Sequence, residues 1–211
     1  MPSALSGKLL SLPAAFLLSA LLLPTKAAAQ EGGAYLEVHL GSAFVKDIPA
    51  FGSEVKLNAG YTTGGALGYR IGAARIETEV AYRHNELDDF EGMAPAAPGP
   101  ATTDGDISAW SLMGNVYLDF RNRSPVTPFI GAGAGAVEIS REAAVIGGRF
   151  LSDHEETGFA YQFMAGAGWD LTEKVSLNLA YRYFSAPDSE VLGQDSDYRS
   201  HNALVGVKLS F

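Results

Sequence analysis

The stretch from Gly158 to Phe184 alternates apolar residues with polar or small residues in two successive runs. Every second residue from Phe159 to Leu171 is aromatic, alanine or leucine, and after a polar break at 172–174 the alternation resumes with valine, leucine and tyrosine. A period of two over this length predicts two antiparallel strands joined by a hairpin. In water the apolar face would need a second sheet to cover it, whereas a bilayer covers it directly if the sheet closes without an edge. The pattern therefore indicates a hairpin of a transmembrane β-barrel.

Residues 1–29 have the features of an export signal. Lys8 supplies a positive charge, an apolar run follows that contains Pro13, and residues 27–29 are alanines. We predict a signal peptide that is cleaved before Gln30, leaving 30–211 as the barrel domain. The alternative is an N-terminal membrane helix, but the run is short for a span of about 20 residues and contains a proline. No cysteine follows the run, which excludes a lipid-anchored lipoprotein.

Composition excludes several classes of protein. The formal net charge of −9 argues against nucleic acid as a partner, because nucleic acid requires a basic face. The absence of cysteine removes disulfides and thiolate metal sites. No apolar run after residue 30 approaches the length of a spanning helix, so any crossing of a membrane is by strands.

The alternation recurs along the chain and predicts an up-and-down antiparallel barrel of about eight strands. The predicted strands are 34–45, 58–71, 74–84, 107–120, 127–139, two within 158–184, and 199–211. Long connections are predicted at 46–57, 85–106, 140–157 and 186–198, and short turns at 72–73, 121–125 and 172–174. Long and short connections alternate, and both chain ends fall on the short-turn side. Barrels of the Gram-negative outer membrane have this layout, with short periplasmic turns and long external loops.

Aromatic residues fall into two belts under this layout, as expected of side chains at a membrane interface. One belt lies near the short turns (Tyr69, Phe120, Trp169, Phe211) and the other near the long loops (Tyr82, Trp110, Tyr161, Tyr183).

The C-terminal run HNALVGVKLSF alternates outward apolar residues and ends on Phe211. Together with GALGYRI, RIETEVAYR, TPFIGAGAGA and the FAYQ…AYRYF hairpin, this run resembles the opacity-protein or OmpA-type family of small outer-membrane β-barrels. The resemblance implies that the last strand, with Phe211, is the recognition signal for the barrel-assembly machinery.

The face opposite the lipid is rich in charge. The inward residues predicted to form a lumen charge network are Glu37, Arg70, Arg75, Glu77, Glu79, Arg83, Asp119, Arg182 and Lys208, and His39 and Asp170 are predicted to face the same way. A barrel of about eight strands has a lumen only wide enough for side chains. We expect the arginines and carboxylates to neutralise each other, because an unpaired buried charge costs several kcal/mol. The alternative is a narrow gated pore lined by the same groups.

Catalytic and metal-binding candidates lie at strand ends and in loops. The candidates for catalysis are His84, the 152–155 segment Ser-Asp-His-Glu, and Ser200-His201. None lies in a recognisable deacylase motif, so we predict no catalytic residues, no cofactor and no metal. Loop carboxylates such as Asp104 and Asp106 have oxygen ligands that suit Ca²⁺ or Mg²⁺, but the prediction that we favour is a hydrated acidic surface.

We therefore expect a non-enzymatic surface protein that supports envelope integrity, adhesion or host contact through its external loops. Its predicted partners are outer-membrane lipid and lipopolysaccharide, the barrel-assembly machinery and host or cell-surface ligands. The leading alternative is a small porin or a carrier of small solutes. A third possibility is a soluble secreted lipocalin-like barrel, which requires the apolar faces to point inward.

Overall fold

The structure, a computed structural model, describes residues 32–45, 48–50, 53–55, 59–86, 106–141, 144–146, 149–151, 154–191 and 194–211. The predicted signal peptide at 1–29 lies outside these residues. Among the described residues, no helix is both long enough and apolar enough to cross a membrane.

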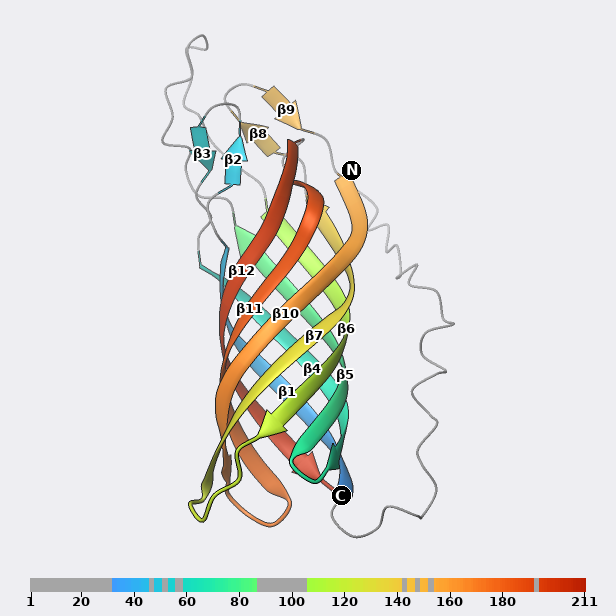
Figure 1. Cartoon of the computed structure of the whole chain (residues 1–211). Coiled ribbons are helices and arrows are strands. Elements are labelled where there is room, and N and C mark those ends of the chain that lie inside the picture. Colours follow the sequence, from blue (N-terminus) through green and yellow to red (C-terminus); the bar gives the residue numbers. More distant parts are fainter. Residues whose placement is uncertain are drawn as a thin grey trace, which may run out of the picture. The chain divides into compact units, whose positions relative to one another are not determined.

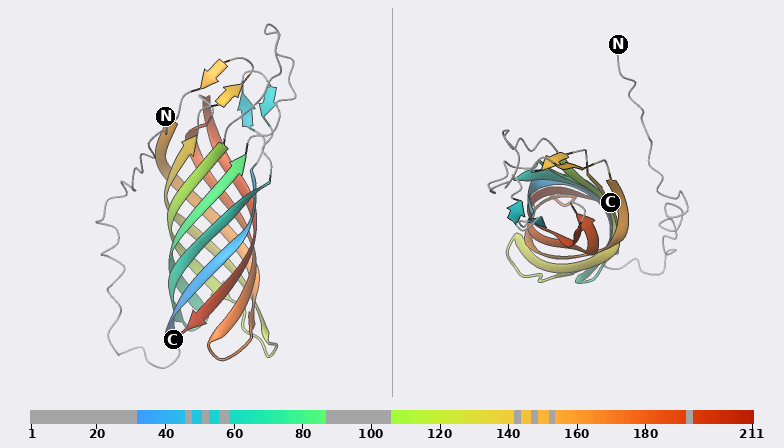
Figure 2. Two further views of the ribbon diagram at one scale, coloured as in Figure 1. Left: turned by 180° about the vertical axis from the view of Figure 1, so that it is seen from behind. Right: turned by 90° about the horizontal axis from the view of Figure 1, so that it is seen from above.

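Eight long strands form one closed barrel in the order β1-β12-β11-β10-β7-β6-β5-β4 (Figures 1 and 2). These strands are β1 Gly32–Val45, β4 Gly60–Ile71, β5 Ala74–Glu86, β6 Asp106–Asp119, β7 Val126–Arg141, β10 His154–Asp170, β11 Val175–Val191 and β12 Gln194–Ser210. Every neighbouring pair is antiparallel, and the order around the barrel follows the order along the chain. The prediction of an up-and-down antiparallel barrel is therefore confirmed.

The first and last strands close the barrel. They pair from Tyr35↔Ser210 to Val45↔Ser200, and the N–H of Phe211 donates to the carbonyl of Ala34 at 3.0 Å. Closure leaves no free sheet edge along this length, as a strand in hydrocarbon requires.

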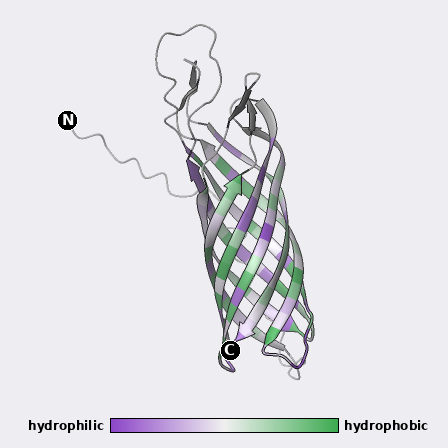
Figure 3. Ribbon diagram, turned by 90° about the vertical axis from the view of Figure 1, so that its left-hand side faces the viewer, coloured by the Kyte–Doolittle hydropathy of each residue, from purple (hydrophilic) through white to green (hydrophobic). Residues whose placement is uncertain are grey.

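The predicted sidedness holds on each strand. Leu179 and Val207 are 59% and 46% exposed on the outside, whereas Glu77 and Arg182 retain 6% and 3% exposure inside. Figure 3 shows hydrophobic and hydrophilic residues alternating along the strands. The soluble lipocalin-like alternative is wrong for this reason, because it places the apolar side chains in the interior.

Glycines on the inner face of β7 make room for larger side chains of β6. A Cβ on Gly131 would lie 2.4 Å from Cδ1 of Tyr117, and one on Gly133 would lie 1.9 Å from Oδ1 of Asn115. The alanines between them, such as Ala134, point outward. The GAGAGA run thus has glycine inside and alanine outside. The sequence could not predict this facing, because glycine and alanine differ little in polarity.

The short turns occur where they were predicted. Gly72 (φ 59°) and Ala73 link β4 to β5, residues 120–125 link β6 to β7, and residues 171–174 link β10 to β11. Asp170 lies on the inner face, as predicted, because its cross-strand partner Ser176 is buried there and its hydroxyl donates to Asp170 at 2.6 Å. Asp170 is nevertheless exposed, because it stands at the end of the barrel beside the last of these turns.

The strands run further on the loop side than the alternation predicted. The loop expected at 186–198 is wrong for most of its length, because β11 extends to Val191 and β12 begins at Gln194. The 140–157 connection contains the ends of β7 and β10 and a hairpin of β8 Ala144–Ile146 and β9 Arg149–Leu151. The 46–57 connection contains a hairpin of β2 Ile48–Ala50 and β3 Ser53–Val55. Strand segments beyond the bilayer need no apolar face, so they lack the pattern that marks the membrane-spanning part.

Residue Leu179, on the outer face of β11 between the two aromatic belts, tests the membrane assignment. We expect Leu179→Arg to lower the free energy of unfolding in phospholipid bilayers by about 2–4 kcal/mol, because a cation at the bilayer midplane is poorly solvated. Thr157→Arg, on the exposed loop end of β10, should cost only about 0–1 kcal/mol. Denaturant titration followed by heat-modifiable gel migration measures both values. Equal costs would contradict the assignment.

Candidate functional site

The lumen near the short-turn end is organised around the guanidinium of Arg75 on β5. Its Nε donates to Oδ1 of Asp119 at 2.9 Å, and its Nη1 donates to Oε1 of Glu77 at 3.0 Å. Nη1 also lies 3.3 Å from the hydroxyl of Tyr35, which donates to the same Glu77 oxygen at 2.5 Å. The guanidinium carbon lies 4.4 Å from the ring centroid of Tyr117. Each polar group of this buried cluster has a partner of complementary charge or a hydrogen bond.

Two further cations border this cluster. Nε of Arg70 lies 3.9 Å from Oδ2 of Asp119, and the Arg70 side chain is 29% exposed. Nζ of Lys208 lies 5.5 Å from the ring centroid of Tyr35 and is buried. Three cations and the carboxylates of Glu37, Glu77 and Asp119 therefore occupy the same part of the lumen.

Halfway along the lumen, Arg182 and Glu79 form an ion pair that crosses the barrel. Arg182 comes from β11 and Glu79 from β5, four strands away in either direction around the eight-strand ring. Nη1 donates to Oε1 at 2.9 Å and Nη2 to Oε2 at 2.6 Å, with both side chains buried. A bidentate pair is the strong form of this interaction. It ties together opposite walls of the barrel.

Amide side chains fill the space between these ion pairs. Nδ2 of Asn178 donates to Oε2 of Glu37 at 2.8 Å, and Nε2 of Gln162 donates to Oδ1 of Asn115 at 2.8 Å. Nδ2 of Asn115 lies 3.5 Å from Oε2 of Glu79. The first two bonds link strands that are not neighbours in the sheet, β11 with β1 and β10 with β6.

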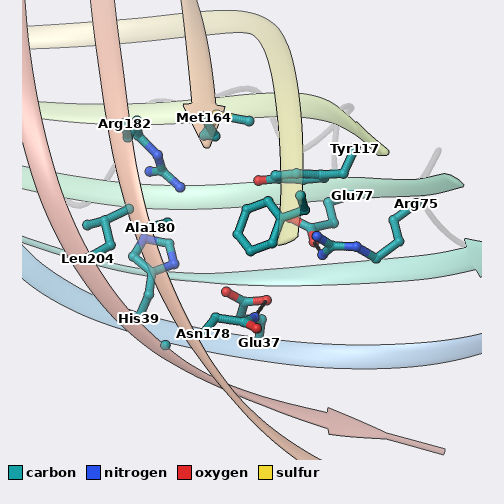
Figure 4. Close-up of a pocket in the computed structure, with 12 residues that line it drawn as sticks. Glu37, His39, Arg75, Glu77, Tyr117, Met164, Asn178, Ala180, Arg182 and Leu204 are labelled. Atoms are coloured by element: carbon teal, nitrogen blue, oxygen red, sulfur yellow. Dashed lines mark hydrogen bonds and ion pairs between the residues drawn. The ribbon is translucent and has the colours of Figure 1, made fainter. Parts of the chain in front are cut away.

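A cavity of about 20 Å³ remains in this network, and Figure 4 shows Glu37, His39 and Arg182 around it. This volume holds about one water molecule. Nε2 of His39, Oδ1 of Asn178 and Nε of Arg182 line the cavity without a hydrogen-bond partner. A buried water molecule suits a cavity of this size and polarity.

Arg83 differs from Arg75 and Arg182 because no carboxylate of the described residues forms an ion pair with it. Its Nη1 donates to Oγ of Ser111 at 2.9 Å, and its guanidinium carbon lies 3.8 Å from the ring centroid of Phe184. Its Nε and Nη2 have no partner among the described residues. The cation is stabilised by the aromatic face and a hydroxyl.

Of the nine predicted lumen residues, the structure joins Arg70, Arg75, Glu77 and Asp119 in one cluster and Glu79 and Arg182 in another. Glu37 bonds to Asn178 and Lys208 lies against Tyr35, while Arg83 lies apart, nearer the loop end. Sequence reasoning missed the partners Tyr35, Asn115, Gln162 and Asn178 as members of the network. Their inward position in the alternation is the signal that identifies them, because polar side chains on the inner face lie within reach of the buried charges.

The catalytic candidates are not brought together. The side chain of Ser200 is buried in the lumen, whereas His201 points outward and its Nδ1 lies 2.5 Å from the hydroxyl of Tyr181. Nδ1 of His84 lies 3.8 Å from Oδ2 of Asp106, and no hydrogen bond joins His84 to Ser108, its cross-strand neighbour. Ser152 and Asp153 lie outside the described residues, as does Asp104 of the possible cation site. Among the residues that are described, no group of three or more His, Asp or Glu side chains is arranged to hold a metal ion.

The model of the outer membrane protein beta-barrel domain matches residues 14–211. An outer membrane protein of Gluconacetobacter diazotrophicus is 31% identical over 140 residues, which are 62% of this chain and 36% of that protein. An uncharacterized protein of Brucella abortus is 32% identical over 100 residues, which are 44% of this chain and 35% of that protein. The matched parts are about a third of the length of these relatives.

Among solved structures, Neisserial surface protein A has a similar fold. The two superpose with a TM-score of 0.59 at 22% identity, over 84% of this chain and 97% of that chain.

The ion pair between Glu79 and Arg182 gives a test of the network. Arg182→Met leaves the Glu79 carboxylate buried without its partner, and we expect a loss of about 3–5 kcal/mol in the free energy of unfolding. The double variant Glu79→Met with Arg182→Met should recover most of this loss, because it removes both charges. Arg83→Met, which breaks no ion pair among the described residues, is the matched control and should cost less. Additive effects of the two single changes would show that the pair is not coupled.

Proposed function

This chain belongs to the family of outer membrane protein β-barrel domains, and on that premise we propose that it is a non-enzymatic surface protein of a Gram-negative outer membrane. It is exported by the signal peptide at 1–29 and inserted by the barrel-assembly machinery, which reads the last strand and Phe211. It contacts its surroundings through the connections on the side opposite the short turns.

The filled lumen is the observation that carries this proposal. The inner face is occupied by ion pairs and amides, and the cavity at its centre has room for about one water molecule. A barrel of this kind offers a solute no passage, so its accessible chemistry lies on the lipid face and at the loop end. The lipid face suits bilayer lipid and lipopolysaccharide, because apolar residues form its centre and aromatic residues its rims.

The connections at 46–57, 85–106 and 140–157, together with the loop-side ends of β11 and β12, are the proposed contact elements for adhesion, host contact or envelope integrity. The sequences of 85–106, 140–157 and 186–198 are rich in carboxylates, whereas 46–57 has as many lysines as carboxylates. The extension of β11 and β12 beyond the aromatic rim supports this role, because these strand ends lie outside the hydrocarbon.

We propose that the barrel catalyses no reaction. Support comes from the opposite orientation of Ser200 and His201 and from the missing hydrogen bond between Ser108 and His84. A serine nucleophile needs a base within hydrogen-bond reach.

A small porin is the second candidate, since the lumen is lined by charged groups. Planar-bilayer recording separates the two functions. We expect the wild-type barrel to give no conductance steps in concentrated salt, with a large general porin as the positive control. Steps that disappear in Arg70→Gln or Glu79→Gln would overturn the proposal in favour of a pore, because these groups would then line the conducting path.

The contact role is tested by shortening one connection. We expect replacement of residues 87–105 by an Asn-Gly turn to leave the barrel folded, because the change joins strands β5 and β6 that already pair. Adherence of expressing cells to host cells, or their resistance to detergent, should fall. Heat-modifiable migration controls for folding. Unchanged adherence and detergent resistance after each of the four connections is shortened in turn would refute the role.

A further inference from the structure

The wall of the barrel divides at the loop end of β10 and β11. The two strands pair only from Asp170↔Ser176 to Tyr161↔Ser185. Beyond this point β10 continues towards His154, paired with β7 alone, and β11 continues to Val191, paired with β12 alone. In Figure 1 the end of β10 diverges from the β11–β12 hairpin.

Hydrogen bonds near the short turn show which backbone N–H and C=O groups of β10 point towards β11. The N–H of Leu171 donates to the carbonyl of Val175 at 2.9 Å, whereas the N–H of Asp170 donates towards β7, to the carbonyl of Pro125 at 3.3 Å. Because these directions alternate along a strand, the N–H and C=O groups of odd-numbered residues of β10 face β11. The N–H and C=O groups of Glu155, Thr157 and Phe159 therefore point into the space between the diverging ends of β10 and β11.

Pro187 explains why the pairing stops. Two residues beyond Tyr161↔Ser185, the register would place Phe159 opposite Pro187 in a pair that exchanges two hydrogen bonds. Proline has no N–H, and its ring occupies the position from which an N–H would donate. The register of β11 with β12 also shifts between Ala186 and Ser189, as in a β-bulge.

The result is an unpaired strand edge that we call the β10 edge: Glu155, Thr157 and Phe159. Within the described part of the chain, no strand pairs with it. It lies two to six residues beyond Tyr161 of the aromatic rim, and its side chains point outward, with Phe159 57% exposed. An exposed edge of this kind is a template for a strand from another chain.

The side chains around the β10 edge define what such a strand must carry. Phe159 presents an aromatic surface, and Glu155 at the other end is exposed. Glu138 of β7 pairs with Thr157 and so points to the same outer face. A strand running antiparallel to β10 would complement this edge with an apolar residue opposite Phe159 and, four residues later, a lysine or arginine opposite Glu155.

We propose that the β10 edge binds an extended, basic segment of a partner protein by β-strand addition. The inference rests on the proposed function, since it takes the loop end to be the external side. Main-chain hydrogen bonds supply the affinity, and Phe159 and Glu155 select the sequence.

The probe is the peptide Ser-Val-Ser-Thr-Ser-Lys-Ser with acetylated and amidated ends. We expect its titration into the isotope-labelled barrel in nanodiscs to shift the backbone amides of Phe159 and Thr157 and to slow their hydrogen exchange. Replacing its lysine with glutamate should weaken binding, because Glu155 and Glu138 repel a carboxylate.

Variants separate strand addition from attraction by surface charge. Thr157→Pro removes an edge N–H without removing a bond to β7, and it should weaken binding about tenfold, whereas Thr157→Val should not. Pro187→Val restores the missing donor of β11, so it should protect the Phe159 amide without peptide and also weaken binding about tenfold. Heat-modifiable migration confirms that each variant is folded.

Equal binding by wild type, Thr157→Pro and Pro187→Val would overturn the proposal in favour of surface charge attraction. Concentration-dependent protection of the wild-type edge without peptide would also overturn it, because a second copy of the chain would then occupy the edge. The titration uses purified protein, so its failure is distinct from a failure of adherence in cells.

Discussion

A strand in hydrocarbon must find hydrogen-bond partners for its whole backbone within the protein, and the rest of this structure depends on that constraint. The pairing of β1 with β12 meets it by removing the last sheet edge. Closure then assigns every second residue to lipid and the others to a lumen too narrow for bulk water. The apolar exterior and the charged interior are two consequences of the same closure.

The charged interior is stable only because its groups meet one another. Arg182 crosses the lumen to Glu79, and Arg75 joins Glu77 to Asp119. Small residues in β7 provide the space for this arrangement. The groups that stabilise the barrel therefore also occupy its lumen.

The constraint ends at the aromatic rim, and the structure changes there. Within the bilayer every strand has two neighbours, but beyond Tyr161 the pairing of β10 with β11 stops at Pro187. Water can solvate an unpaired edge that lipid cannot. A proline that would break the wall at mid-membrane is therefore tolerated at this height, where it leaves an edge open to a partner.

Alternation along the chain was enough to predict the closed barrel, the outward position of Leu179, the inward position of Glu77 and the turn at Gly72. Lipid on one side and a narrow lumen on the other impose a period of two that is visible residue by residue. The same reasoning could not pair Arg182 with Glu79, which is 103 residues away. It also missed the extension of β11 past Ser185. Partners across the lumen depend on register and on the closure of the ring, and strand ends outside the bilayer carry no apolar face, so both emerge only when the chain is folded.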